Sequence, residues 1–237
     1  MRIQSQLAYI LHKRAFRDSS QILEVFTRDH GRLGLLSRGS RSAKSRRAGL
    51  LQLYRPLLIH WSGRGELPVL SAVEAAEIRA PALHGRALLS AMYVNELLMH
   101  LLHRHDVHQR LFERYHECLY RLQGGPVEPV LRLFEKDLLA ELGFALNLSH
   151  DADSGEPIEP AARYHYQVEH GPVRVTQPDS TARPLLHGRS LLAYGANTLD
   201  SADTLREIKQ LSRHVLNHHL GHRKLRSREL FRRPSHA

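Results

Sequence analysis

The sequence predicts an α+β protein with a small five-stranded β-barrel at its amino terminus and a mainly helical domain after it. Two observations lead to this prediction. Up to about residue 80, apolar and polar side chains alternate with the period of two that is typical of strands. From about residue 82 the apolar side chains recur with the period of an α-helix. We therefore expect two domains, at residues 1–80 and 81–237.

Five strands separated by polar turns are expected in the first domain. They cover residues 7–16, 21–28, 32–38, 50–61 and 68–78. Ile22, Glu24 and Phe26 alternate with Leu23 and Val25, which predicts a strand buried on one face only. Five strands in a segment of this length suit a closed barrel, because closure leaves no exposed sheet edge. The pattern alone does not separate an oligonucleotide-binding barrel from an SH3-like barrel.

The second domain is expected to contain helices and one inserted β-hairpin. Helices are expected at about 82–102, 107–122, 127–142, 184–194 and 201–220, with a last turn at 227–231. The first of these helices is apolar around most of its circumference, so we expect it to lie centrally. Residues 150–184 are rich in proline and contain two short alternating segments, which predict the inserted hairpin.

Positive charge is concentrated at the two ends of the sequence. Residues 1–80 hold 14 basic and 6 acidic side chains, residues 81–205 hold 11 and 16, and residues 206–237 hold 9 and 2. Two basic segments around an acidic middle favour a polyanionic partner over a uniformly solvated surface. No basic amphipathic helix with exposed Trp or Phe supports a membrane surface as that partner, so nucleic acid is favoured.

The candidate nucleic-acid contacts are cations and aromatic rings. Small residues alternate with cations in the loop after the third strand, which lets the backbone approach phosphates closely. The candidate phosphate contacts are Arg28, Arg38, Arg41, Lys44, Arg46 and Arg47 near the amino terminus, and Arg223, Lys224, Arg226, Arg228, Arg232 and Arg233 near the carboxyl terminus. A solvated basic tail is an equal alternative for the second set. The candidate stacking faces are Tyr9, Phe16, Phe26, Tyr54 and Trp61, although a small barrel needs most of them for its core.

No catalytic arrangement is recognised in the sequence, and no cofactor or metal is expected. There is no P-loop and no Gly-x-Ser-x-Gly motif. Cys118 is the single cysteine, so a disulfide framework is excluded. It lies two positions after His116, which places the two side chains on different sides of a helix. His214, His218 and His222 have the spacing of metal ligands, which leaves a metal-dependent nuclease or hydrolase as one alternative. A sequence-specific DNA-binding regulator is the other, although it would need a helix-turn-helix.

Residues 20–47 resemble the amino-terminal barrel of the RecO family, the bacterial recombination mediators. The resemblance rests on the Val-Phe-Thr segment of the second strand, a glycine in the following turn and the Arg-Gly-Ser-Arg segment at residues 38–41. Residues 131–143 and 220–230 fit the same family in the same order. The resemblance implies an oligonucleotide-binding barrel in a DNA repair protein that is not an enzyme. By this resemblance, the protein is expected to bind single- and double-stranded DNA and to anneal complementary strands. It is also expected to work with RecR and to help RecA replace the single-strand-binding protein on DNA.

The resemblance also implies a site on the helical domain for the acidic, hydrophobic tail of the single-strand-binding protein. Such a tail needs an apolar slot and a cation for its carboxylate, and the candidates are Arg121, Leu131, Arg132, Phe134 and Lys136. Many relatives carry a four-cysteine zinc ribbon at the hairpin; this chain lacks those cysteines, so zinc is not expected. The sequence has no secretory signal and no apolar run of membrane length, so we expect a cytoplasmic, nucleoid-associated protein.

Overall fold

The computed structural model describes residues 2–42, 45, 47–63, 65–176 and 184–231. Contacts within the chain divide it into two compact units. The first unit consists of residues 1–124 and 225–237, and the second of residues 125–224. The sequence boundary near residue 80 marks the change from strands to helices, whereas the contacts group the first two helices and the carboxyl-terminal segment with the barrel.

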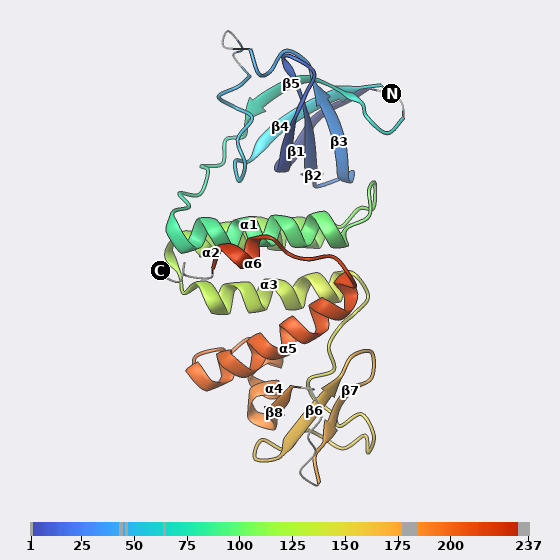
Figure 1. Cartoon of the computed structure of the whole chain (residues 1–237), viewed down its shortest axis with the longest axis vertical. Helices are drawn as coiled ribbons and strands as arrows, with labels where there is room; N and C mark the ends of the chain where they lie inside the picture. The colour runs from blue at the N-terminus through green and yellow to red at the C-terminus, as the bar shows by residue number, and fades with distance from the viewer. Residues whose placement is uncertain (1, 43–44, 46, 64, 177–183, 232–237) are drawn as a thin grey trace, which may run out of the picture. The chain divides into compact units, whose positions relative to one another are not determined.

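Five strands form a closed barrel in the first unit (Figure 1). They are β1 (Arg2–Phe16), β2 (Ser20–Thr27), β3 (Gly31–Ser37), β4 (Leu57–Ser62) and β5 (Val69–Ala75). The strand order is β1-β2-β3-β5-β4, and β1 also pairs with β4 to close the barrel. The pair β3–β5 is parallel, and the other pairs are antiparallel. This topology is that of the oligonucleotide-binding fold, so the predicted fold class is confirmed.

The first and fourth strands differ in length from the prediction. β1 starts at Arg2 because its first half pairs with β4 while its second half pairs with β2. β4 starts at Leu57, later than expected. In the preceding segment Tyr54 has a φ of 63°, and Pro56 has no amide hydrogen to donate to a ladder. Leu51 in that segment still packs in the barrel core, which explains why the pattern predicted a strand there.

The barrel is packed on its outer face as well as inside. Helices α1 (Gly85–Leu101) and α2 (Gln109–Gly124) belong to the same unit. Tyr9 and Phe26 point outward from the strands and lie 5.7 and 5.3 Å from the ring of Phe112 in α2. Both side chains are fully buried. The prediction that the second strand is buried on one face only was therefore wrong, because the helical layer covers the face that the pattern assigned to solvent.

A buried polar bridge joins α1, α2 and β1. The side chain of Asn95 in α1 donates a hydrogen bond to the backbone oxygen of Leu11, at 2.9 Å. The hydroxyl of Tyr115 in α2 donates to the Asn95 amide oxygen, at 2.7 Å. Burial raises the pKa of Tyr115 well above its usual value, so the hydroxyl remains a donor. These bonds satisfy polar groups that would otherwise be costly to bury.

The loop between α1 and α2 is held against β3. The amide of His105 donates to the backbone oxygen of Arg32, at 2.8 Å. Arg104 and Arg32 both pair with the carboxylate of Glu24 on β2. Gly31 lies under this loop, where an added Cβ would be 1.9 Å from the backbone oxygen of Asp106.

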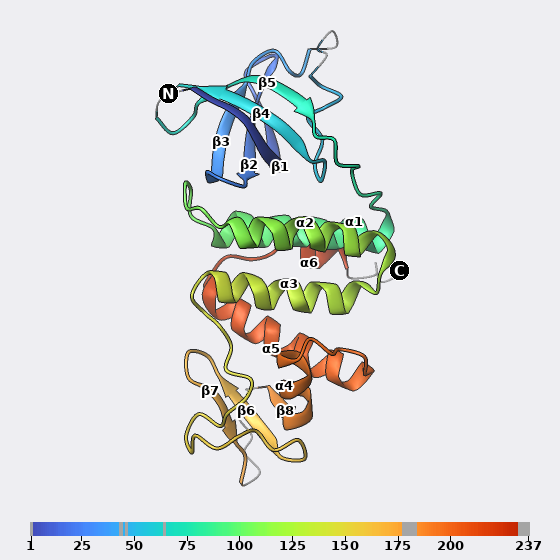
Figure 2. The same cartoon turned by 180° about the vertical axis from the view of Figure 1, so that it is seen from behind.

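The second unit combines helices with a small sheet (Figures 1 and 2). Its elements are α3 (Val127–Glu141), β6 (Arg163–Gln167), β7 (Gly171–Arg174), β8 (Leu185–His187), α4 (Gly188–Gly195) and α5 (Ala202–Leu220). Strands β6 and β7 form the expected hairpin, and β8 adds a third strand beside β6 that the sequence did not predict. Helix α5 contacts both α3 and α4. No helix in the described part of the chain has the length and apolar character needed to cross a membrane.

The small sheet is held by buried side chains and by one carboxylate. Tyr164 and Tyr166 are 1% and 3% exposed, as expected for a hairpin held by packing. Asp151 precedes the hairpin, and its carboxylate accepts hydrogen bonds from the amides of Asp153, Ser154 and Arg174 at 2.7–2.9 Å. These bonds tie the preceding loop to the end of β7.

Two glycines with nearly equal backbone angles test how closely the α1–α2 loop packs on β3. Gly31 and Gly39 have φ values of 63° and 65°, but only Gly31 has heavy atoms within 4 Å of an added Cβ. We expect Gly39→Ala to reduce the free energy of unfolding by about 1–2 kcal/mol, the cost of the left-handed conformation. Gly31→Ala adds a clash with Asp106 and should cost at least about 1–3 kcal/mol more. Urea denaturation measures both, and equal costs would contradict this packing.

Candidate nucleic-acid interface

An open groove lies on the barrel where the β1–β2 turn, the end of β3 and the β4–β5 loop meet. Its volume is about 560 Å³. The lining residues are Phe16, Arg17, Ser19, Ser20, Leu36, Arg38, Gly39 and Leu67. In oligonucleotide-binding folds the face of strands 2 and 3, between these same two loops, is the usual binding surface. The groove is therefore the leading candidate interface in the described part of the chain.

Phe16 is the predicted stacking residue that the groove leaves accessible. The other four aromatic candidates, Tyr9, Phe26, Tyr54 and Trp61, are at most 8% exposed and belong to the packed interior, as expected. The guanidinium carbon of Arg17 lies 5.3 Å from the centroid of the Phe16 ring. A ring beside a guanidinium offers a stacking surface for a base and a cation for a phosphate.

Arg17 was not among the residues that the sequence identified. It has a φ of 52°, in the left-handed region, within the turn that joins β1 to β2. A non-glycine residue in this conformation is uncommon, and functional sites are one place where it occurs. The sequence carries no local signal for it, because Arg-Asp-Ser-Ser reads as an ordinary polar turn.

The structure separates the loop cations into two groups. Arg38 lines the groove and is exposed. Arg41 is also exposed, but its guanidinium donates to the backbone oxygen of Arg17 at 3.1 Å, and its amide donates to that of Ser19 at 2.9 Å. Arg41 therefore braces the turn that forms one wall of the groove. Lys44 and Arg46 lie outside the described residues.

Arg47 and Arg28 have contacts away from the groove. The Arg47 guanidinium donates to the backbone oxygens of Leu70 and Ser71 at 3.3 and 2.6 Å, which fastens the basic loop to β5. Arg28 follows the far end of β2 and lies 3.5 Å from the carboxylate of Glu113. The structure therefore does not bring Arg28 to the groove, although sequence analysis placed it in the same set.

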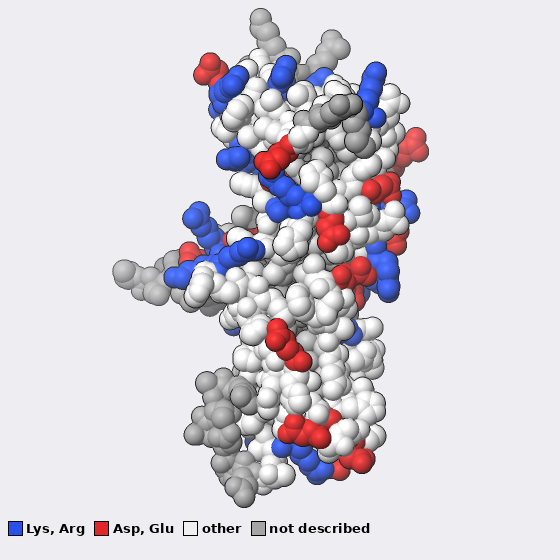
Figure 3. All heavy atoms as spheres, turned by 90° about the vertical axis from the view of Figure 1, so that its right-hand side faces the viewer, with Lys and Arg blue, Asp and Glu red and all other residues white. Residues whose placement is uncertain are grey.

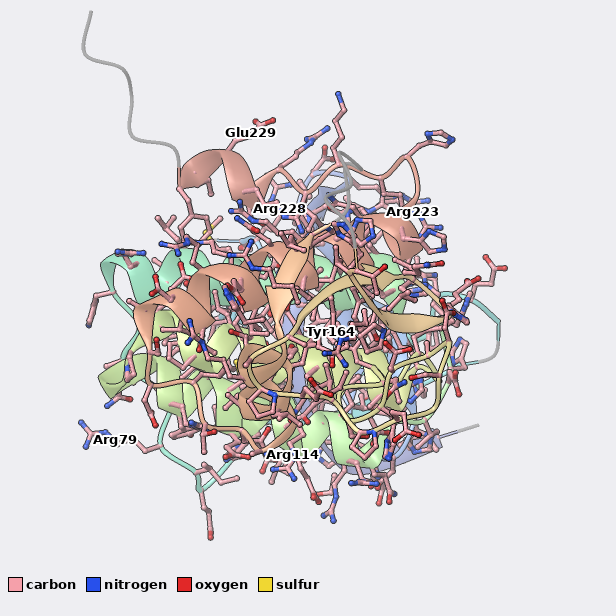
Figure 4. The ribbon with its side chains drawn as sticks, turned by 90° about the horizontal axis from the view of Figure 1, so that it is seen from below. Arg79, Arg114, Tyr164, Arg223, Arg228 and Glu229 are labelled. Atoms are coloured by element: carbon pink, nitrogen blue, oxygen red, sulfur yellow. The ribbon has the colours of Figure 1, made fainter. Side chains whose placement is uncertain are left out.

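The carboxyl-terminal cations are divided between the two units. Arg223 and Lys224 are exposed residues of the second unit, whereas Arg226 and Arg228 belong to the first. The guanidinium carbon of Arg228 lies 5.8 Å from the ring centroid of Tyr93, and Figure 4 labels it beside Glu229. Arg226 and Arg228 are thus part of a packed segment rather than of a solvated tail. Arg232 and Arg233 lie outside the described residues.

Glu96 of α1 fastens this carboxyl-terminal segment, whose short helix is α6 (Ser227–Leu230). Its carboxylate accepts hydrogen bonds from the amides of Arg226 and Ser227 at 2.8 and 2.9 Å, and from the Ser227 hydroxyl at 2.5 Å. Burial alone would raise the pKa of Glu96, but these hydrogen bonds outweigh it and hold the pKa below its usual value.

Cations and carboxylates are mixed on the face shown in Figure 3. Lysine and arginine side chains are spread over the barrel, at the top of the view, with acidic side chains between them. Dispersed cations suit contacts to phosphates along a strand more than recognition of one compact anion.

The five residues predicted to bind a protein tail are buried in, or paired with other residues of, their own units. Arg121 is in the first unit, where it lies 3.6 Å from Glu117, and the other four are on α3 in the second. Leu131 and Phe134 are 4% and 3% exposed. The tail-binding role remains a prediction, because both of these apolar side chains are buried in the described structure.

The two α3 cations of that set have internal partners. Arg132 is 4% exposed and pairs with the buried carboxylate of Glu135 at 2.8 Å. The ammonium of Lys136 donates to the backbone oxygen of Tyr194 and to the side chain of Asn197, both at 2.6 Å. It thereby caps the carboxyl end of α4, and burial lowers its pKa.

The histidine pairs do not form a metal centre in the described part of the chain. His218 lies 3.4 Å from a carboxylate oxygen of Glu169, and the neighbouring His219 stacks on Phe144 at 4.0 Å. Among the described residues no group of three or more His, Cys, Asp or Glu side chains has a metal-binding arrangement. Cys118 is buried in α2.

Comparison with known proteins gives matches along nearly the whole chain. The family model "Recombination protein O N terminal" matches residues 1–79, and "Recombination protein O C terminal" matches residues 83–229. A DNA repair protein RecO of Aromatoleum aromaticum is 40% identical over 98% of this chain and 96% of its own length. One from Methylococcus capsulatus is 43% identical over 96% and 93%, and one from Coxiella burnetii is 43% identical over 97% and 98%.

Acidification should release the segment that Glu96 holds. Because the folded pKa is below the unfolded value, near 4.5, the contact contributes full stability above about pH 4.5 and loses it as the pH falls through the folded pKa. At pH 7 we expect Glu96→Ala to weaken protection of residues 225–231 by about 1–2 kcal/mol in hydrogen exchange. The difference from the wild type should shrink towards pH 3. A difference independent of pH would mean that the charge of Glu96 is not what holds the segment.

Substitution of Arg38 and Arg47 should separate binding from stability. Arg47→Ala removes two hydrogen bonds to β5 and should lower the free energy of unfolding by about 1–2 kcal/mol. A loss of this size should lower Tm by roughly 4 °C. Arg38→Ala should leave Tm unchanged and weaken binding of a single-stranded oligonucleotide several-fold. Calorimetry measures Tm, and fluorescence anisotropy measures binding of the oligonucleotide. A lower Tm for Arg38→Ala, with weaker binding only for Arg47→Ala, would contradict the roles given to these two arginines.

Proposed function

The chain belongs to the RecO family of DNA repair proteins, and on this premise we propose that it is a recombination mediator that binds single- and double-stranded DNA and anneals complementary strands. The observation that carries the proposal is the groove on the barrel. It combines the half-buried ring of Phe16, the adjacent guanidinium of Arg17 and the exposed cation of Arg38. These groups lie where oligonucleotide-binding folds hold single strands.

Annealing requires that repulsion between two polyanions be reduced. Cations that contact phosphates do this without reading bases and without consuming a nucleotide. Besides the groove, the first unit carries Arg226 and Arg228, which the Glu96 contact keeps on α1. Two separate groups of cations on one unit support simultaneous binding of two strands. Contacts of this kind also favour sequence-independent binding over the role of a sequence-specific regulator.

The partners in this proposal follow from the family relationship. We propose that the protein works with RecR, binds the tail of the single-strand-binding protein and helps RecA onto coated DNA in the cytoplasm, close to the nucleoid. Tail binding on α3 would require Leu131 and Phe134 to become exposed. Arg132 is a poor probe of that site, because its removal would leave the buried carboxylate of Glu135 without its ion-pair partner.

Annealing by a variant that lacks the two groove cations tests the proposal. We expect Arg17→Ala with Arg38→Ala to slow the annealing of complementary oligonucleotides about tenfold at low salt. The log–log salt slope of single-strand binding should become shallower by about 1.4, because each phosphate contact contributes about 0.7.

Arg114→Ala is the matched control for this experiment. Arg114 is an exposed α2 cation, paired with Glu117 at 2.8 Å and labelled in Figure 4. The substitution removes one charge from the same unit outside the groove, so annealing should be close to that of the wild type. An unchanged rate and slope in the double variant would reject the groove as the binding site.

A further inference from the structure

A second cavity lies at the mouth of the barrel. Its volume is about 270 Å³, and its wall is formed by Ile3, Leu33, Trp61 and Pro68. Two imidazoles, those of His30 and His105, line the same cavity. The interior of this small pocket is thus apolar, while part of its lining can donate or accept hydrogen bonds.

Both imidazoles are carried by backbone that is held in place. The amide of His30 donates to the hydroxyl of Thr27 at 3.1 Å, and the His30 ring stands edge-on to the Trp61 ring at 5.3 Å. His105 has a φ of 63°, and its amide is bonded to the backbone of Arg32. The pocket is therefore largely preorganised, which lowers the entropic cost of binding a ligand there.

The pocket and the groove share the β4–β5 loop. Leu67 lines the groove and the next residue, Pro68, lines the pocket. The Leu36 amide donates to the Pro68 carbonyl at 2.8 Å, so the loop is fixed to β3 between the two sites. Leu36 of the groove and Leu33 of the pocket are three residues apart on β3, so their side chains lie on opposite faces of the strand, with Leu33 in the barrel core. The two residues are about 10 Å apart along the strand. That distance is about three phosphate spacings of a stacked DNA strand.

We propose that this pocket holds one unstacked base of a single strand that is bound in the groove. The proposal rests on the proposed function, because it assumes that the groove binds DNA. A base has apolar faces and a polar edge, which match an apolar wall and hydrogen-bonding imidazoles. An imidazole both donates and accepts, so the pocket takes any of the bases.

The same chemistry gives the pocket a preference for single strands. In a duplex the bases are stacked and their pairing edges are occupied, so placing one in the pocket would require flipping it out at a cost of a few kcal/mol. The groove can contact the phosphates of either form, whereas the pocket adds affinity only for a strand with free bases. We infer that the pocket distinguishes single-stranded from double-stranded DNA.

Trp61 is the only tryptophan of the chain, so emission excited selectively from tryptophan, and not from the tyrosines, reports on this pocket. The full chain is titrated with a twelve-residue thymidine oligonucleotide, and separately with a duplex of the same length. Tryptophan emission and the anisotropy of a labelled oligonucleotide are measured together. We expect the emission to change in parallel with single-strand binding and to stay constant with the duplex.

The two readouts separate this proposal from the proposed function. Anisotropy that rises while the emission stays constant would overturn base capture and leave DNA binding intact. No rise in anisotropy would reject DNA binding itself, and base capture with it. An emission change with an apolar peptide but not with the oligonucleotide would assign the pocket to a protein partner and overturn the proposal.

Rim substitutions give a second test that leaves the barrel core unchanged. We expect His30→Ala with His105→Asn to weaken single-strand binding about fivefold and duplex binding by less than twofold, because the hydrogen bonds to the edge of one base are lost. Asparagine tolerates the left-handed backbone at position 105. His103→Asn, at an exposed position of the same loop outside the pocket, is the matched control and should bind like the wild type. Equal losses for both DNA forms, or no loss, would overturn the proposal.

Discussion

The contact between the outer face of the barrel and α2 is the interaction on which the rest of the first unit depends. Tyr9 and Phe26 leave the strands on the side away from the barrel core and are buried against Phe112 and Tyr115. Each buried aromatic side chain of this size contributes on the order of 1.5–3 kcal/mol. Because of this contact, one side of the barrel is covered by helix α2. The groove forms elsewhere, at the β1–β2 turn and the β4–β5 loop, which are therefore free to bind a ligand.

The arginines of this chain serve two purposes that charge counting does not distinguish. Arg41 and Arg47 donate to backbone oxygens of the barrel, because a guanidinium has five donors and loop carbonyls need partners. Arg17 and Arg38 face the groove instead. The number of cations that can contact phosphates directly is therefore smaller than the net charge suggests. The structural arginines still contribute, since they hold the loops that shape the groove.

The carboxyl-terminal segment returns to the unit that contains the amino terminus. Glu96 accepts three hydrogen bonds from Arg226 and Ser227, two residues that lie about 130 positions later in the sequence. Two basic regions at opposite ends of the sequence thereby contribute cations to one compact unit. This arrangement supports the proposal that the protein contacts two strands at once.

The sequence by itself determined most of the strands and helices, the closed barrel, the interior position of most aromatic residues and, through its motifs, the family. These features depend on local periodicity and turn residues, which involve positions close together in the sequence. Only the tertiary structure decided that β2 is buried on both faces, that β8 joins the hairpin, that Arg47 is bonded to β5 and that Arg17 lies beside Phe16. Each of these depends on what packs against a residue from elsewhere in the chain or on an unusual backbone angle, and a pattern of neighbours does not contain that information.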